Sequence, residues 1–356
     1  MLDLSDDVVS LTCALVDVES VSGQESRLAD LVETALRPLE LEVERHGNVV
    51  VARTDSARPA RVVLAGHLDT VPIAANVPSV RDGDVLRGCG TSDMKSGVAV
   101  ALRLAQLIGS GAVAPGVDVT WIFYDCEEVE AARNGLGRLA RERRELLSGD
   151  LAILLEPTSG VVEGGCQGTL RALVRTAGKR AHSARSWLGV NAIHAAAPIL
   201  STLAGYEARV VEVDGLTYRE GLNAVAISGG VAGNVVPDEC VVTVNHRFAP
   251  DRSEDDGAAH VRDVFAGFEV EIVDSAPAAR PGLDRPLAAA FLRAVGGEAS
   301  AKLGWTDVAR FGALGVPAVN FGPGDPNLAH TVDEHVRIDK IIAAEQALTR
   351  FLATSS

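Results

Sequence analysis

The sequence has few aromatic side chains, which make up only 4% of its 356 residues, whereas 47% of the residues are hydrophobic. We therefore expect a core built from Ala, Val and Leu rather than from aromatic rings. A chain of this length exceeds what one hydrophobic core usually supports, so two domains are predicted.

The sequence also lacks the cysteine patterns of disulfide-rich or cysteine-zinc proteins. Its five cysteines are scattered, odd in number and form no C-x-x-C pair, and we predict reduced thiols. The first residues, MLDLSDDVVSL, are acidic and do not resemble an export signal, and no run of 18 apolar residues occurs. These features predict a cytoplasmic protein without membrane anchoring.

Positive charge is in deficit, with 33 Lys and Arg against 48 Asp and Glu and a net charge of −15. A nucleic-acid or anionic-membrane partner requires a basic surface, so the composition argues against both. An anionic small-molecule substrate would need arginines placed locally around its site.

The first half of the chain alternates between helical and strand patterns, which indicates an α/β fold. Helices are predicted over 5–17, 23–36 and 97–108, and strands over 48–53, 61–70, 117–128 and 151–157. Later in the chain, a helix near 287–295, a strand in PAVNFGP and a terminal helix from Ile338 follow.

Between these parts, glycines cluster around 160–168 and a new pattern begins. A strand, a helix at 190–204, strands at 222–231 and 239–247, a helix at 253–265 and a strand at 268–273 give the order βαββαβ, which is ferredoxin-like. We predict a large domain in two parts, 1–165 and 275–356, with 166–274 inserted as a smaller domain.

Acids and histidines follow the predicted strands in five separate segments: His67 with Asp69, Asp93, Glu127 with Glu128, Glu156, and His330. Any one acid alone is more often a helix cap or a solvated side chain. In open α/β sheets, however, residues at the carboxyl ends of strands meet at one edge. Imidazole and carboxylate ligands suit zinc and related metals, and Asp69 is placed to orient His67.

The adjacent Glu127 and Glu128 follow an almost wholly apolar strand, where two uncompensated carboxylates would repel each other. A nearby cation removes that cost. Strand alternation then directs one side chain to a metal and leaves its neighbour able to take a proton from a metal-bound water.

The segments GHLDTVP, GTSDMKSG, CEE, LLEPT and AHTVDEH stand in an order and spacing that resembles the M20 family of zinc-dependent amidohydrolases and exopeptidases, most closely its desuccinylase branch. The resemblance spans essentially the whole chain. It implies a zinc-exopeptidase-like, mixed-sheet α/β/α catalytic domain with an inserted ferredoxin-like lid and dimerisation domain.

Carried over by motif, the resemblance implies two zinc ions per subunit, with cobalt or manganese as possible replacements. His67 and Glu156 would bind one ion, Glu128 and His330 the other, and Asp93 would bridge them. Glu127 would be the general base, and Asp69 would support His67.

The segment AHSARS resembles the family's lid histidine, which stabilises the tetrahedral oxyanion and is often supplied by the partner subunit of a homodimer. This residue would be His182. A surface turn is the alternative for His182, and His194 is a weaker competitor for the role. Cys126, where an aspartate is common in relatives, is expected to pack rather than to bind metal.

Four residues occupy positions where family members hold a substrate carboxylate: Asn234, Arg247, Thr306 and Arg310. The planar fork of an arginine suits a carboxylate, although surface ion pairs are the alternative for both arginines. The chain departs from better-known desuccinylases near Cys166, in EGGCQGT, where they carry an arginine.

The resemblance implies hydrolysis of a small N-acyl amino acid, N-succinyl-L,L-2,6-diaminopimelate. N-acetylornithine deacetylation, or another aminoacylase or dipeptidase activity, is the alternative within the family. An inactive binding relative is the alternative of another class, but such proteins usually lose metal ligands, and here all are present.

Overall fold

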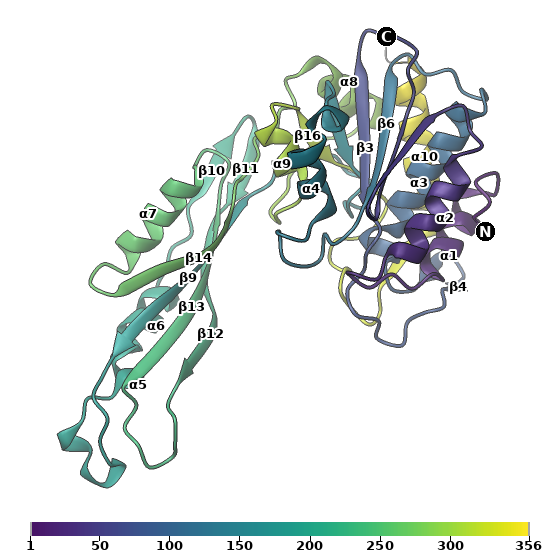
Figure 1. Ribbon diagram of the computed structural model, residues 1–356. Helices are drawn as coiled ribbons and strands as arrows, with labels where there is room; N and C mark the ends of the chain where they lie inside the picture. Colours follow the sequence, from purple (N-terminus) through teal and green to yellow (C-terminus); the bar gives the residue numbers. More distant parts are fainter. Residues whose placement is uncertain (1, 355–356) are drawn as a thin grey trace. The chain divides into compact units, whose positions relative to one another are not determined.

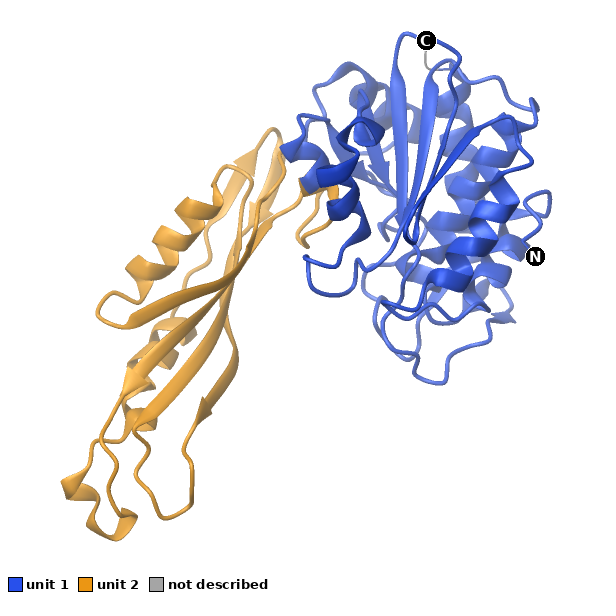
Figure 2. Ribbon diagram, in the orientation of Figure 1, with its two compact units in different colours: residues 1–164, 281–300, 310–356 blue, residues 165–280, 301–309 orange. Residues whose placement is uncertain are grey.

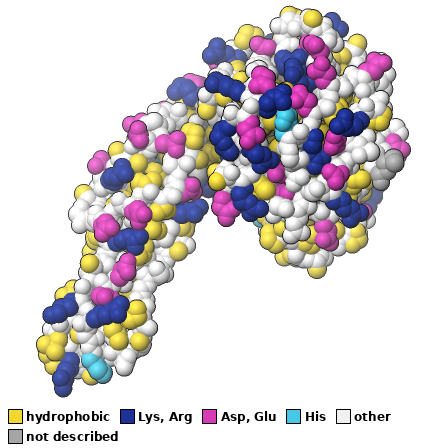
Figure 3. Space-filling view, in the orientation of Figure 1, with side chains coloured by type: hydrophobic (Ala, Val, Ile, Leu, Met, Phe, Trp, Pro, Cys, Tyr) yellow, Lys and Arg dark blue, Asp and Glu magenta, His cyan; other side chains and the backbone are white. Residues whose placement is uncertain are grey.

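The computed structural model describes residues 2–354, which divide into two compact units. Within the described residues, the first unit comprises 2–164, 281–300 and 310–354, and the second comprises 165–280 and 301–309, as Figure 2 shows. The second unit therefore also includes 301–309, a stretch that the sequence pattern grouped with 275–356. On the face shown in Figure 3, acidic and basic side chains are interspersed rather than gathered by sign.

A mixed eight-stranded sheet forms the centre of the first unit, in the order β1-β2-β6-β3-β7-β16-β8-β15. The strands β6, β3, β7 and β16 run parallel, and antiparallel strands lie on either side of them. The strands are β1 (Glu42–His46), β2 (Val49–Arg53), β3 (Arg61–His67), β6 (Asp118–Tyr124), β7 (Leu151–Leu154), β8 (Glu163–Gly164), β15 (Ser300–Ala301) and β16 (Ala318–Asn320).

Helices cover this sheet because its parallel strands are apolar along nearly their whole length. In β3, residues 62–65 are completely buried, as is usual for a strand with both faces covered. Figure 1 shows α1, α2, α3 and α10 together beside the sheet. The helices are α1 (Val8–Val16), α2 (Ser26–Leu36), α3 (Ser96–Gly109), α4 (Gly135–Glu142), α8 (Pro286–Val295), α9 (Val308–Ala313) and α10 (Ile338–Thr354).

A small three-stranded sheet brings the C-terminal part of the chain beside the segment that precedes α3. It consists of β4 (Val80–Asp82), β5 (Val85–Arg87) and β17 (His335–Arg337), in the order β17-β5-β4. His335 pairs with Arg87, so the residues before β17 lie next to those after β5. Two predicted ligand segments, around Asp93 and His330, are thereby joined.

The second unit has the predicted ferredoxin-like order, with a four-stranded antiparallel sheet arranged β12-β13-β9-β14. Its elements are β9 (Gly168–Ala177), α5 (Ala192–Ala195), α6 (Ala197–Ala204), β12 (Gly221–Gly229), β13 (Glu239–Phe248), α7 (Glu254–Val264) and β14 (Glu269–Ala276). A hairpin of β10 (Val210–Val213) and β11 (Leu216–Arg219) was not predicted.

The α/β prediction is confirmed, but two strands end earlier than expected. β3 stops at His67 and β6 at Tyr124, so Asp69, Glu127 and Glu128 lie in turns beyond the sheet. The expectation that strand alternation separates Glu127 from Glu128 is therefore wrong. Cys126, with φ +58°, turns the chain out of the strand before the pair.

Gly97 allows the start of α3 to approach the end of β7. A Cβ at this position would lie 2.2 Å from the carbonyl oxygen of Leu155, the residue before Glu156. We expect Gly97→Ala to lower the free energy of unfolding by about 1–3 kcal/mol, because backbone would have to move. Thermal or urea unfolding measures this. Gly233→Ala, where no atom lies within 4 Å, is the control, and an equal loss in both variants would contradict the argument.

Candidate metal centre

His67 lies at the end of β3 with its imidazole almost fully buried between two acids. Its Nδ1 lies 3.0 Å from the backbone oxygen of Asp69, and its Nε2 lies 3.1 Å from Oδ1 of Asp93. A bond from Nδ1–H to Asp69 leaves Nε2 as the ligand atom, which is how outer carboxylates and carbonyls orient metal-binding histidines.

Asp69 is fully buried and holds the turn that carries the two glutamates. Its Oδ1 accepts the backbone N–H of Glu127 at 3.0 Å, and its Oδ2 accepts that of Glu128 at 3.1 Å and the Ser22 hydroxyl at 2.7 Å. Burial raises the pKa of Asp69, but the bonds from His67 and these N–H groups outweigh it and lower the pKa to about 2.

Asp93 extends one oxygen toward each of two histidines. Oδ1 faces Nε2 of His67 at 3.1 Å, and Oδ2 lies 3.5 Å from Nε2 of His330, which in turn lies 2.9 Å from Oε1 of Glu128. A carboxylate between two imidazoles is the arrangement that a bridging ligand requires. The structure thus brings together His67, Asp93, Glu128 and His330 from four separate segments.

The charges of this cluster account for the pKa shifts of its histidines. Burial lowers the pKa of His67, but hydrogen bonds to Asp69 and Asp93 raise it well above its usual value. Hydrogen bonds to Asp93 and Glu128 raise the pKa of His330 to about 10. The protonated histidines therefore compensate the negative charge of the acids, and a metal cation can take the place of those protons.

This donor set fits a divalent metal. Ligand atoms of His67, Asp93 and Glu128 lie within 4.8 Å of one another. Imidazole nitrogen and carboxylate oxygen suit zinc and its neighbours. Glu156 lies outside this group, buried two residues beyond β7, the strand that pairs with β3. Glu127 is half-buried and is not a member of the group either.

Glu334, which the sequence reasoning missed, holds the segment around Asp93. Its buried carboxylate accepts the backbone N–H groups of Gly90 at 2.9 Å, Ser92 at 2.8 Å and Asp93 at 3.0 Å. The only signal in the sequence is its place in AHTVDEH, four residues after His330. Its contacts depend on the pairing of β17 with β5, which no local pattern reveals.

In the second unit, His182 and Asn234 lie together. The backbone N–H of Ser183 donates to the Asn234 carbonyl at 2.9 Å, and Nδ1 of His182 accepts the N–H of Ala184 at 3.1 Å. Because Nδ1 accepts this N–H, Nε2 is the ring nitrogen that is available as a donor. His194, by contrast, lies within α5.

Arg247 lies at the opposite end of the same sheet. It pairs with Gly221 and Thr169, whereas Glu239, next to the loop of Asn234, pairs with Ala177. Glu239 and Arg247 are eight positions apart along β13, or about 27 Å. Within one chain, the second unit therefore does not bring His182 and Asn234 together with Arg247.

The two later candidates, Thr306 and Arg310, lie on different units. Thr306 is buried in the second unit, where its carbonyl accepts the Cys166 thiol with an S···O distance of 3.7 Å. The Arg310 guanidinium lies against Gly137 of α4 in the first unit.

The sequence matches the family described as Peptidase family M20/M25/M40 over residues 63–354. The chain belongs to this family. As a member, it is a hydrolase that acts on an amide bond, and its metal-ligand segments all lie within the matched region.

Two relatives align over nearly their whole length. A protein of Mycobacterium tuberculosis provisionally named succinyl-diaminopimelate desuccinylase is 56% identical, with 99% of each chain covered. The succinyl-diaminopimelate desuccinylase of Corynebacterium glutamicum is 48% identical, with 99% of this chain and 98% of the relative covered.

Solved structures share the fold at lower identity. A tripeptidase from Staphylococcus aureus superposes with a TM-score of 0.81 at 22% identity, covering 99% of this chain and 98% of that one. A dinuclear metal binding peptidase of the M20 family from Bacillus subtilis gives a TM-score of 0.72 at 18% identity, covering 97% and 96%.

The raised pKa of His330 makes the stability of the metal-free protein depend on pH. A histidine with a raised folded pKa stabilises fully below its unfolded value, about 6.5, and loses that contribution as pH rises toward about 10. We expect the Tm of chelator-treated protein to fall between pH 6.5 and 8, and added zinc to suppress the fall.

The His330→Gln variant is the control: it lacks one of the two histidines with a raised pKa, so its Tm should fall less than that of the unmodified protein. Above pH 8 the buried Lys95, whose pKa burial lowers to about 8, acts in the opposite direction, so the measurement stops there. An equal fall in Tm for His330→Gln and the unmodified protein would contradict the assignment.

Proposed function

We propose that the chain is a succinyl-diaminopimelate desuccinylase, which hydrolyses N-succinyl-L,L-2,6-diaminopimelate to succinate and L,L-diaminopimelate in lysine and diaminopimelate biosynthesis. The names of the two full-length relatives support this substrate. The observation that carries the chemistry is the carboxylate of Asp93 between two histidines, with Glu128 on the second one. The five free thiols are in keeping with a cytoplasmic location.

Two zinc ions per subunit are part of the proposal. His67 and Glu156 would hold one ion, His330 and Glu128 the other, and Asp93 would lie between them. The paired geometry at Asp93 supports the bridging role. When bound, such ions lower the pKa of a shared water and polarise the amide carbonyl.

The helices of residues 2–354 include none with the length and apolar character that a membrane span requires.

The protein groups would then move protons and bind charge. Glu127 accepts a proton from the attacking water and later gives it to the departing amine, as general bases do. The backbone N–H of Glu127 donates to Asp69, and this hydrogen bond fixes the position of the backbone from which the Glu127 side chain extends. His182, with its proton on Nε2, donates to the oxygen that becomes negative in the tetrahedral state.

Substrate carboxylates would be bound by four residues: Arg247, Thr306, Asn234 and Arg310. Arg247 is half-buried in β13, and this burial lowers its pKa because the guanidinium charge loses contact with water. A bound carboxylate would stabilise that charge. Thr306 lies beside Cys166, whose thiol donates to the Thr306 carbonyl. Asn234 and Arg310 complete the proposed set.

A homodimer would form through the second unit, along the outer edge of its sheet. β12 is an edge strand with unpaired backbone groups, and its side chains Val225 and Ile227 are 59% and 51% exposed. Ile193 and Leu200 of the neighbouring helices are also exposed. An apolar open edge of this kind favours pairing with another strand. A partner would thereby supply His182 and Asn234, which lie far from Arg247.

The role of Glu127 is tested by Glu127→Gln. We expect this variant to keep both metal ions, because Glu127 is not in the ligand group, and to lose about 10²–10⁴-fold in kcat. Metal analysis and steady-state hydrolysis measure the two effects. Glu130→Gln, an exposed neighbour, is the control. Unchanged hydrolysis by Glu127→Gln would remove Glu127 from the mechanism.

The substrate is tested by measuring kcat/KM for N-succinyl-diaminopimelate and for N-acetylornithine under the same conditions. A site built around a cation rejects a neutral acyl group strongly, because its charge is left unpaired. We expect a preference for the succinyl substrate of at least about 10²-fold. A preference for N-acetylornithine would refute the proposed activity but not the family.

Catalysis by His182 across the dimer is tested by subunit mixing. Glu127→Gln and His182→Asn are each expected to be inactive. In a mixed dimer, one site has an intact Glu127 and receives an intact His182 from its partner. Equal mixing, which makes about half of the dimers mixed, should restore roughly a quarter of the unmodified activity. No recovery would show that His182 acts within its own subunit.

A further inference from the structure

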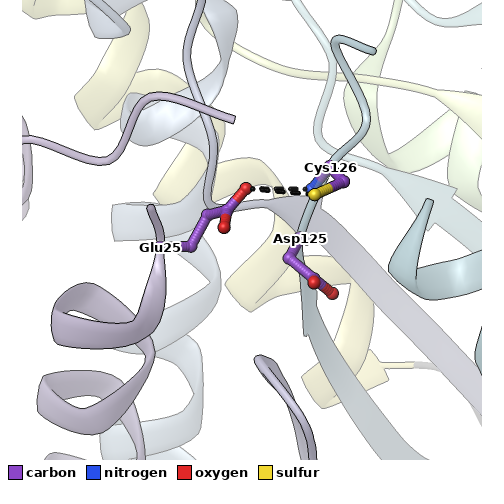
Figure 4. A group of neighbouring side chains, drawn as sticks. All are labelled: Glu25, Asp125 and Cys126. Carbon is purple, nitrogen blue, oxygen red and sulfur yellow. Dashed lines mark hydrogen bonds between the residues drawn. The ribbon is translucent and has the colours of Figure 1, made fainter. Parts of the chain in front are cut away.

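A second group of metal-ligand atoms lies beside the proposed centre, formed by Glu25, Asp125 and Cys126. Glu25 directly precedes α2, and the other two residues follow β6. Figure 4 shows the Glu25 carboxylate directed at Cys126, while the Asp125 carboxylate turns away from it.

The contacts of this group show hydrogen bonding rather than metal binding. Asp125 is paired with the Arg138 guanidinium at 2.8 Å. Burial, together with the charges of Glu25 and Asp125, raises the pKa of the Cys126 thiol to about 12, so it remains protonated and lies 3.5 Å from Oε1 of Glu25. Two of the three groups are therefore already satisfied.

Glu25 accepts hydrogen bonds from two backbone N–H groups. Its Oε1 accepts the N–H of Gly23 at 2.6 Å and the N–H of Cys126 at 3.2 Å. The side chain is fully buried, and within residues 2–354 its Oε2 has no hydrogen-bond partner. A buried carboxylate that uses only one oxygen is costly, which makes the bonds that it does form informative.

One of these hydrogen bonds is made to the turn at Cys126, which directly precedes Glu127, the proposed base. Cys126 has a φ of +58°, a left-handed conformation that is strained for a residue with a side chain. Glu25 holds the N–H of Cys126, and Asp69 holds the next two, those of Glu127 and Glu128. Three successive N–H groups are thus fixed by two buried carboxylates.

We propose that Glu25 is a positioning residue for the general base: it fixes the Cys126 turn and thereby the placement of the Glu127 carboxylate. The proposal rests on the proposed role of Glu127. Glu127 directly follows Cys126, whereas Glu128 lies one residue further along and its side chain is also held by His330, so loss of Glu25 affects the base more than the metal ligand.

A matched pair of variants tests this. Glu25→Gln can keep every bond through its amide oxygen, with the NH2 group in the place of Oε2, whereas Glu25→Met has a similar size and accepts none. We expect Glu25→Met to lower kcat by about 10- to 100-fold with KM within about threefold and both metal ions retained. Glu25→Gln should restore kcat to within about threefold of the unmodified enzyme.

A double variant separates positioning from general loss of structure. If Glu25 acts through Glu127, Glu25→Met should cause no further loss of residual activity in the Glu127→Gln background. A merely structural role would lower that residual activity again. If Glu25→Met does not fold, Glu25→Asp serves in its place, because its shorter side chain cannot reach the Cys126 N–H.

Unchanged kcat in Glu25→Met, equal losses in the Gln and Met variants, or additive losses in the double variant would each overturn the proposal. Loss of the metal ions with kcat would do so as well. These outcomes differ from failure of the proposed function, which would show as undiminished hydrolysis in Glu127→Gln alone.

Discussion

The mutual repulsion of buried carboxylates at the end of the central sheet is the constraint on which the rest of the site depends. Asp69, Asp93, Glu128 and Glu334 all lie within this region with little exposure to water. The protein stabilises them in two ways. Nε2 atoms of histidines lie against Asp93 and Glu128, whereas Asp69 and Glu334 accept backbone N–H groups, and Asp69 also lies beside Nδ1 of His67. Asp93 and Glu128 are therefore the acids whose oxygens share space with free ring nitrogens, as metal ligands must, while Asp69 and Glu334 hold the backbone around them.

Most of the fold was predictable because its signals are local. The apolar runs of β3 and β6 and the period of α3 are continuous patterns, and the βαββαβ order of the second unit follows from element sequence alone. The ends of strands were less predictable. β6 stops at Tyr124 because Cys126 takes a left-handed conformation held by Glu25, a residue about 100 positions earlier, and no propensity encodes such a contact.

The sequence predicted the candidate metal ligands but not the residues that hold the backbone around them. His67, Asp93, Glu128 and His330 were found from residue type and motif, and the structure brings them together. Glu334 and Glu25 were missed because each binds backbone rather than ligand, so neither has a chemical signature in the sequence. The separation of His182 from Arg247 along β13 was also hidden, since sequence distance says nothing about which end of a sheet a loop reaches.

The hydrogen bonds from Gly90, Ser92 and Asp93 to Glu334 have a consequence for the order in which the protein folds. These bonds join residues more than 240 positions apart, and His330 lies about as far from Asp93. Closing loops of that length is slow compared with forming local helices and hairpins. The segment bearing Asp93 therefore reaches its final form only after the residues around Glu334 have been synthesised and have docked on it, and the proposed metal centre would be complete no earlier.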